Sequence, residues 1–167
     1  TSLNPVLKVG YQMIETMRVH GAASKAEAVE RAVAGLRQVG VPDPERALRR
    51  YPHEFSGGTA QRILIAIALI NAPRLVVADE PTSALDATVQ RQILDLLNHL
   101  VKTTHMTMLV ISHDFGAVAS LSDSVAGMYA GQIVEDGPAE IVLNEPQHPY
   151  TAALITSARG GRGRIMR

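Results

Sequence analysis

Leu75-Val76-Val77-Ala78-Asp79-Glu80 is the stretch that decides the fold, because four apolar residues run directly into two acids. A short apolar run of this kind predicts a strand that is buried on both faces of a parallel sheet. A second run, residues 106–111, ends in Ser112-His113-Asp114. A helical pattern separates the two runs, and this strand, helix, strand order predicts an α/β architecture with a parallel sheet.

Helical patterns dominate the sequence before the first strand. Residues 8–20 predict one helix, and a capping box at residues 24–27 opens a second helix that Gly40 can end. An apolar segment at residues 60–72 predicts a further helix whose N-cap is Ser56. We therefore expect a largely helical front third.

The sequence after the first strand continues the alternation. Asp86 can cap a helix whose apolar residues form a single stripe: Ile93, Leu96, Leu97, Leu100 and Val101. Residues 124–129 and 132–135 then predict two strands joined at Ala130-Gly131.

Composition excludes several classes of protein. Of the 167 residues 46% are apolar, and 16 basic residues balance 16 acidic ones, so the chain is neither a disordered polymer nor a protein that coats DNA. Without cysteine it has no thiol chemistry. Its longest apolar run, residues 63–70, is far shorter than the roughly 20 residues that span a bilayer. The start at Thr1, without Met or signal-peptide features, suggests a chain cut from a longer one.

Phe55-Ser56-Gly57-Gly58 is the first candidate site. Two glycines let the backbone approach a ligand, and the following helix presents unpaired N–H groups and the positive end of its dipole. The pattern therefore indicates an anion site. A glycine-rich turn with a serine cap has the same pattern, and this tetrapeptide region alone does not decide between the two.

Acids and a histidine follow the two predicted strands. Asp79 could hold Mg²⁺ through water, and Glu80 could orient and deprotonate an attacking water. His113 follows the second strand at the same edge of the sheet, where its imidazole could donate a hydrogen bond to a terminal phosphate. The alternative is a solvated loop or helix cap for the acids and a surface role for the histidine, which is one of six.

Taken in order, these segments resemble the C-terminal part of an ATP-binding cassette (ABC) ATPase from Thr1 to about Ser157. Residues 55–62 look like the family's signature loop, residues 75–80 like its Walker B strand and residues 83–86 like its D-loop, and His113 looks like its switch histidine. The resemblance implies a P-loop NTPase-like (RecA-like) parallel sheet core with an ABC α-helical subdomain.

The resemblance also divides the chain into three parts. Residues 1–55 correspond to the helical subdomain, residues 56–145 to the C-terminal part of the nucleotide-binding core, and residues 146–167 to an extension and tail. The N-terminal strands, the Q-loop and the Walker A loop, Gly-x-x-x-x-Gly-Lys-Ser/Thr, are missing. We therefore expect a fragment that hydrolyses ATP very slowly or not at all alone and that has lowered stability, because sheet edges are left unpaired.

Four further segments resemble one subfamily, the ATPases of di- and oligopeptide importers. These are Thr1-Ser2-Leu3-Asn4-Pro5, Tyr51-Pro52-His53-Glu54-Phe55, Met128-Tyr129-Ala130-Gly131 and His148-Pro149-Tyr150-Thr151. The likeness implies a subunit that hydrolyses ATP to energise peptide uptake through membrane permease subunits, with a substrate-binding protein as an indirect partner. Its place would be peripheral, at the cytoplasmic face of the inner membrane. Nickel and glutathione importers have closely similar ATPases, so the resemblance implies only a cargo class.

The family also implies roles for individual residues, with ATP and Mg²⁺ as ligands and no nucleic acid. Asp79 would bind Mg²⁺ through water, Glu80 would polarise the attacking water, and His113 would steady the γ-phosphate. Asp86 in the D-loop would couple the two sites of a head-to-tail dimer with a second ABC ATPase subunit. The signature loop would complete the partner's nucleotide site through Ser56, Gly57, Gly58 and Gln61.

Two alternatives remain open at this point. One is an ABC ATPase outside transport, for example in repair or translation, although the Tyr-Pro-His and His-Pro-Tyr segments speak against it. The other is a nucleotide-free interaction module that binds a transporter or a partner cassette through its helical face. Thr59 and Ala60 depart from the family, since Gln or Met and then Arg or Ser are more usual there, but Thr59 keeps a polar group near the helix start.

Overall fold

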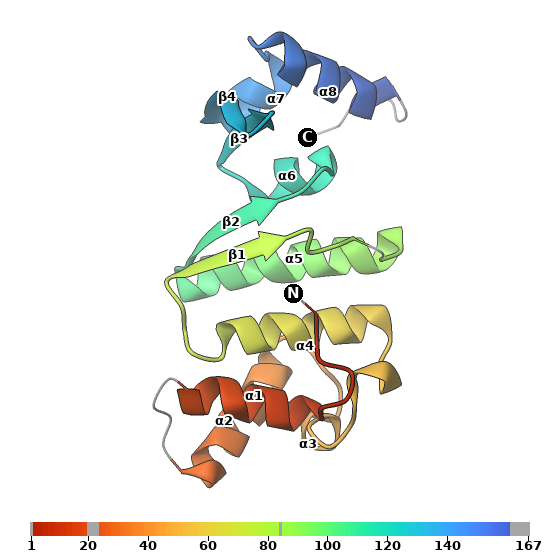
Figure 1. Cartoon of the computed structure of the whole chain (residues 1–167), viewed down its shortest axis with the longest axis vertical. Helices are drawn as coiled ribbons and strands as arrows, with labels where there is room; N and C mark the ends of the chain where they lie inside the picture. Colours follow the sequence, from red (N-terminus) through yellow and green to blue (C-terminus); the bar gives the residue numbers. More distant parts are fainter. Residues whose placement is uncertain (1, 20–23, 84, 161–167) are drawn as a thin grey trace. The chain divides into compact units, whose positions relative to one another are not determined.

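The computed structural model describes residues 2–19, 24–83 and 85–160 (Figure 1). The chain forms two compact units, Thr1–Leu109 and Val110–Arg167. The three parts expected from the sequence, residues 1–55, 56–145 and 146–167, stay a prediction, and residues 161–167 of the third lie outside the described residues.

The first unit is mainly helical. Its helices are α1 (Val9–Val19), α2 (Lys25–Gln38), the short α3 (Pro44–Ala47), the 3-10 turn η1 (Pro52–Glu54), α4 (Gly57–Leu69) and α5 (Ala87–Thr104). The helices expected at residues 8–20 and 60–72 are thus confirmed, with α4 starting three residues early, at Gly57. Ser24 caps α2 as predicted, and Gly40, at φ +73°, follows its end.

The core of the first unit lies where α1, α2 and α4 pack together. Its fully buried side chains include Met13, Met17, Leu36 and Ile63. Helix α5 packs against α4. The predicted stripe of α5 is confirmed at its buried positions, Ile93, Leu97 and Leu100, whereas Leu96 and Val101 are only half-buried and Leu94 is buried as well.

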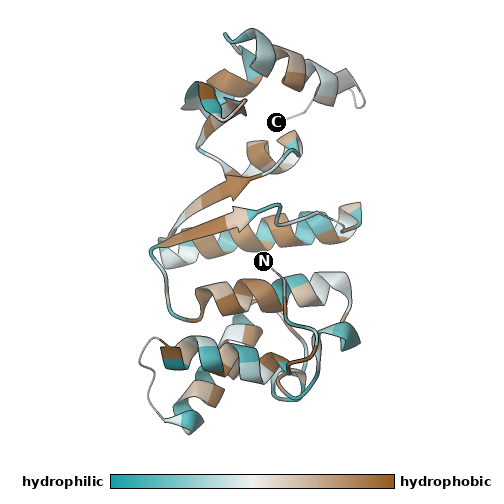
Figure 2. Ribbon diagram, in the orientation of Figure 1, coloured by the Kyte–Doolittle hydropathy of each residue, from teal (hydrophilic) through white to brown (hydrophobic). Residues whose placement is uncertain are grey.

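Strands β1 (Leu75–Asp79) and β2 (Thr107–Ile111) form a two-stranded sheet and run parallel, as expected (Figure 1). The expectation that the first strand is buried on both faces is wrong. Leu75 and Val77 are 57% and 56% exposed, and Leu109 on β2 is 53% exposed. Both strands are strongly apolar (Figure 2), yet these three side chains are more than half exposed. An apolar run shows only what a strand can bury, because burial also needs a second layer.

The second unit contains α6 (Phe115–Leu121), β3 (Ser124–Tyr129), β4 (Gln132–Pro138), α7 (Ala139–Asn144) and α8 (Pro149–Gly160). The predicted hairpin is confirmed: β3 and β4 are antiparallel, Tyr129 pairs with Gln132, and Ala130-Gly131 turns with positive φ at both residues. Ala139, Leu143 and Ile155 form a small core, against which Phe115 and Val125 pack.

None of the helices within the described ranges combines the length and apolar character that a membrane span requires.

Candidate functional site

Helix α4 begins with the side chains expected from the sequence. Ser56 is extended, and its Oγ accepts the N–H of Thr59 at 3.3 Å, so the predicted N-cap is confirmed. The Thr59 hydroxyl lies 2.9 Å from the Ser56 hydroxyl. Because the first N–H groups of a helix have no acceptor within it, the amides of Gly57 and Gly58 add to the positive end of the α4 dipole. Gln61 is half-buried one turn further along.

The two glycines lie against the segment that leads into α5. A Cβ built on Gly58 would be only 2.5 Å from Cγ1 of Val89, and one on Gly57 would be 3.4 Å from Cδ2 of Leu85. The first distance is a clash and the second an ordinary contact. The structure therefore brings the predicted signature loop and the end of the predicted D-loop together. Sequence reasoning missed Val89. Its position in the first turn of the helix that Asp86 caps could have identified it, because that turn follows the predicted D-loop directly.

The segment before α4 is a turn that caps itself. The Glu54 carboxylate accepts the Tyr51 N–H at 2.6 Å and lies 3.4 Å from Nε of Arg50, which also donates to the Glu54 carbonyl. The hydrogen bond from Tyr51 is the main cause that lowers the pKa of Glu54. His53 stacks on the Tyr51 ring at 5.6 Å. These contacts fix the direction in which the chain enters α4.

The same segment satisfies the start of α1. The N–H groups of Val9 and Gly10 donate to the carbonyls of Arg50 and Leu48 at 3.0 and 2.9 Å. A Cβ at Gly10 would lie 2.7 Å from the Leu48 carbonyl oxygen, so this close approach requires glycine. The lead-in to the signature loop is therefore held from both sides, by its own side chains and by α1.

The two acids lie at the end of β1. Asp79 is the last residue of the strand and is exposed. Glu80 has a left-handed backbone with φ +47°, and its carbonyl accepts the Ser83 hydroxyl at 3.0 Å and the Ser83 N–H at 3.2 Å. A left-handed conformation costs a residue with a side chain roughly 1–2 kcal/mol. Such strain is concentrated at functional positions, so the conformation is consistent with a role for Glu80.

These acids fit a magnesium site that is completed by a ligand. The described residues contain no group of three or more His, Asp or Glu side chains that could hold a metal ion. Mg²⁺ is usually bound through one or two carboxylates together with substrate phosphates and water, rather than by a cage of protein ligands. An exposed Asp79 with Glu80 beside it matches that requirement.

Asp86 caps α5 as predicted. Its Oδ1 accepts the N–H groups of Thr88 and Val89, both at 3.0 Å. The cap therefore fixes the turn that carries Val89. Of the predicted D-loop, residues 83–86, Ala84 lies outside the described residues.

His113 belongs to the second unit, where it follows β2 and is exposed. The next residue, Asp114, caps α6 by accepting the N–H groups of Gly116 and Ala117 at 2.8 and 3.3 Å. Glu80 belongs to the first unit. The expected approach of His113 to Glu80 stays a prediction.

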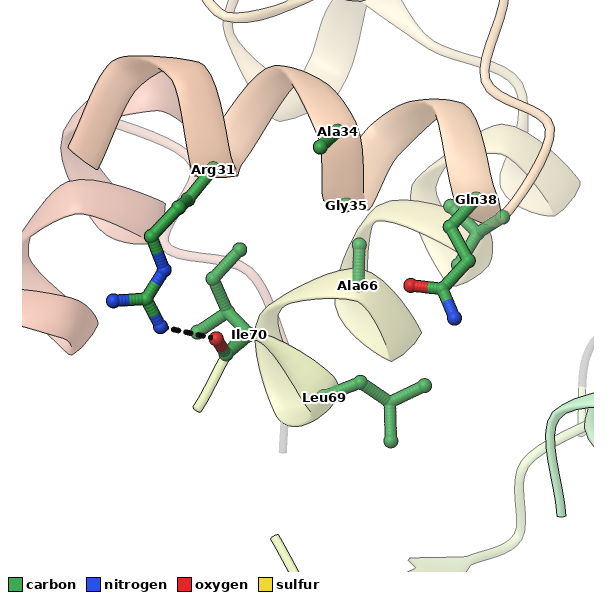
Figure 3. A pocket seen from close by; sticks show the side chains of 8 residues that line it. Arg31, Ala34, Gly35, Gln38, Ala66, Leu69 and Ile70 are labelled. Atoms are coloured by element: carbon green, nitrogen blue, oxygen red, sulfur yellow. Dashed lines mark hydrogen bonds between the residues drawn. The ribbon is translucent and has the colours of Figure 1, made fainter. Parts of the chain in front are cut away.

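A hollow between α2 and α4 is separate from these residues (Figure 3). It is lined mainly by apolar or small residues, such as Gly35 and Ala66, with Gln38 at one end. Arg31 is the only charged residue among those that line it, and Arg31 donates to the Ile70 carbonyl at 3.0 Å. None of the predicted site residues lines this hollow, and we assign it no chemistry.

Sequence reasoning also missed Glu135, which anchors the His-Pro-Tyr segment in the second unit. Its carboxylate accepts the N–H groups of Gln147 and His148 at 2.7 and 3.1 Å. The hydrogen bond from Gln147 is the main cause that lowers the pKa of Glu135. The rings of Tyr129 and Tyr150 also meet at 4.3 Å. The available signal was an acid placed directly after the apolar pair Ile133-Val134 in a predicted strand.

Known proteins resemble this chain along most of its length. The family model described as ABC transporter matches residues 2–83. The chain is 50% identical to the oligopeptide transport ATP-binding protein OppD of Bacillus subtilis over 157 residues, which are 94% of this chain and 44% of OppD. It is 46% identical to the dipeptide transport ATP-binding protein DppD of Escherichia coli over 155 residues, 93% of this chain and 47% of DppD. The chain thus spans about half the length of the curated relatives it matches.

Solved structures agree with the expected fold. A dimeric bacterial ABC transporter cassette, MJ0796, matches 82% of this chain and 59% of its own with a TM-score of 0.68 and 28% identity. A putative metal-chelate type ABC transporter matches 90% of this chain and 58% of its own with a TM-score of 0.75 and 23% identity. The α/β, P-loop NTPase-like fold class is therefore confirmed. With the sequence identities, these matches establish that the chain belongs to the ABC transporter family of ATP-binding proteins.

Proposed function

We propose that this chain supplies part of the ATP-binding subunit of an importer for di- or oligopeptides. The observation that carries the proposal is the identity of about half of 157 aligned residues to a protein named for oligopeptide transport, with similar identity to a dipeptide transport protein. ATP hydrolysis by the complete subunit would energise uptake through membrane permease subunits, to which a substrate-binding protein delivers the peptide.

The start of α4 would contact a nucleotide held by a second ABC subunit. The capped helix offers the amides of Gly57 and Gly58 and the Ser56 hydroxyl to an anion, and Gln61 lies one turn beyond. MJ0796 supports a dimeric arrangement, because it was solved as a dimer and in a post-hydrolysis state bound to ADP and Pi. We infer a head-to-tail dimer in which each subunit completes the other's site.

The end of β1 would perform the hydrolysis. Asp79 would hold Mg²⁺ through water, and Glu80 would take the proton from the attacking water. Bound Mg²⁺ neutralises charge that develops on the phosphate oxygens. His113 would donate a hydrogen bond to the γ-phosphate, and Asp86 would couple the two sites of the dimer.

The place of action follows from the partners. A subunit that binds ATP and drives a permease would work as a peripheral protein at the cytoplasmic face of the inner membrane.

A chimera tests the enzymatic part of the proposal. The segment of B. subtilis OppD that precedes the aligned region is joined to this chain, and MgATP hydrolysis is measured. We expect turnover that falls at least about 100-fold with Glu80→Gln, because a general base contributes roughly 100-fold or more. Glu30→Gln, an exposed acid on α2, is the matched control and should leave turnover unchanged. A chimera without turnover, or with turnover that is indifferent to Glu80→Gln, would contradict the assignment.

A second experiment tests the cargo class. The aligned part of E. coli DppD is replaced by this chain, and uptake of a labelled dipeptide is measured in cells that lack their own DppD. We expect uptake that depends on Glu80. Normal ATP hydrolysis by the hybrid without dipeptide uptake would count against a peptide importer.

A further inference from the structure

We infer that Val89 is a positioning residue for the start of α4, where its side chain fills the space that a Cβ at Gly58 would occupy. The packing itself concerns only residues of the first unit. Its consequence for the nucleotide rests on the proposed function.

The backbone of Gly58 does not explain why glycine is there. The positive-φ glycines among the described residues are Gly40 and Gly131, so Gly58 has a conformation that any residue can adopt. Glycine inside a helix lowers stability relative to alanine. Space at this position is limited, because Cγ1 of Val89 lies 2.5 Å from the Cβ that an alanine would have.

Both partners of the contact between Val89 and Gly58 lie in helix starts that are capped. Asp86 accepts the Val89 N–H at 3.0 Å and thereby sets the first turn of α5. Ser56 sets the first turn of α4 by accepting the Thr59 N–H. Two capped helix starts thus meet through one valine and one glycine. A movement of Asp86 would move Val89, and the Val89 side chain would in turn displace Gly58 and its amide. This coupling needs no ligand.

Two explanations for Gly58 can now be separated. If glycine serves only to let a phosphate approach the backbone, the side chain at residue 89 does not matter. If glycine makes room for Val89, a smaller residue at position 89 should permit alanine at position 58. Gly57, whose Cβ would lie at an ordinary contact distance of 3.4 Å from Leu85, provides the matched control.

Urea unfolding of the 167-residue chain tests the packing. We expect Gly58→Ala to lower the unfolding midpoint, although alanine favours helix, and Gly57→Ala to leave it unchanged or raise it. Combining Gly58→Ala with Val89→Ala should recover at least half of the loss in midpoint. If Gly58→Ala alone fails to fold, the double variant should still fold. A midpoint raised by Gly58→Ala, or a double variant as unstable as the sum of the single changes, would overturn the packing.

Turnover of the chimera with OppD tests the positioning role. Well below the unfolding temperature, we expect Val89→Ala to lower kcat several-fold with little change in KM, and Gly58→Ala to lower it further. The double variant should be faster than Gly58→Ala. Val101→Ala, a half-buried valine near the other end of α5, is the control for a merely structural change. A Val89→Ala enzyme with unchanged kcat, or a double variant no faster than Gly58→Ala, would overturn the role. If the unmodified chimera is inactive, the proposed function fails, while the urea experiment still judges the packing.

Discussion

The start of α4 and the end of β1 both carry family motifs, yet they differ in how completely this chain supports them. At the start of α4, Ser56 supplies the cap, Glu54 fixes the lead-in and Val89 packs against Gly58. At β1, Leu75 and Val77 are more than half exposed. The contacts at the start of α4 therefore form between neighbouring segments of the chain. Burial of the β1 side chains requires a second layer, and Leu75 and Val77 are exposed among the described residues.

The largest effect should come from the packed region. Ile63 on α4 is fully buried, whereas Leu75 on β1 is 57% exposed. We expect Ile63→Ala to lower the free energy of unfolding by about 2–5 kcal/mol, because it removes buried atoms and leaves a cavity. Leu75→Ala should cost less than about 1 kcal/mol, since little buried surface is lost. Urea unfolding measures both. Equal losses of unfolding free energy in the two variants would show that Leu75 is as buried as Ile63, so that β1 and α4 do not differ in packing.

Nucleotide binding should be the next largest difference. The start of α4 offers donors to a phosphate, but the chain has no Walker A loop. We expect the isolated chain to bind MgATP at least about 100-fold more weakly than the chimera with OppD, since two lost charge-assisted hydrogen bonds at about 1.5 kcal/mol each correspond to that factor. Isothermal calorimetry on both proteins is the measurement. Micromolar binding by the isolated chain would mean that the signature region suffices.

The caps and helices could be predicted because they depend on neighbouring residues in the sequence. Ser56, Asp86 and Ser24 each bond to an N–H two or three positions along. The likeness to known cassettes was also visible in the order of the motifs, and the fold comparison confirms the class.

The remaining features depend on contacts that no local pattern contains. Leu75 and Val77 on β1 are exposed, and an apolar run alone cannot report whether a second layer packs on a strand. The contact of Gly58 with Val89 joins residues 31 positions apart, so the glycine could be assigned to a ligand as readily as to a helix. The left-handed Glu80 is set by its turn with Ser83, and glutamate is not a residue that signals such a backbone.

The Asp86 cap gives a prediction of intermediate size. Asp86→Ala removes the acceptor of two amides at the start of α5 and should cost about 1 kcal/mol of unfolding free energy. Asp95, on the same helix, makes only an exposed ion pair with Arg91, so Asp95→Ala should cost less than about 0.5 kcal/mol. Thermal or urea unfolding of both variants checks this. If the two losses are the same, the cap does not hold the turn that carries Val89.

Relief of strain at β1 should produce a gain of similar or smaller size. Glu80→Gly replaces a left-handed residue that has a side chain and should raise the unfolding free energy by at most about 1 kcal/mol. Glu80→Gln keeps the strain and should give no such gain. Both variants should abolish turnover of the chimera. A stability gain shared by glutamine would attribute the effect to charge and not to the backbone.

The smallest effect concerns Glu135, which shares with the start of α4 a cap formed entirely within the chain. Hydrogen bonding, first from Gln147, lowers its pKa below the ordinary value of 4.5 in the folded state. The folded chain therefore binds fewer protons than the unfolded chain around that pH, so the stabilisation is complete above 4.5 and is lost as the pH falls through the lowered pKa. We expect Glu135→Gln to flatten the decline of stability between neutral and acidic pH, as measured by urea midpoints. Glu145→Gln, an exposed acid nearby in sequence, is the control and should leave the slope unchanged. An identical slope in wild type and Glu135→Gln would show that the carboxylate does not anchor the segment before α8. Glu135 would then resemble the cap at the start of α4 in its hydrogen bonds but would not stabilise the fold.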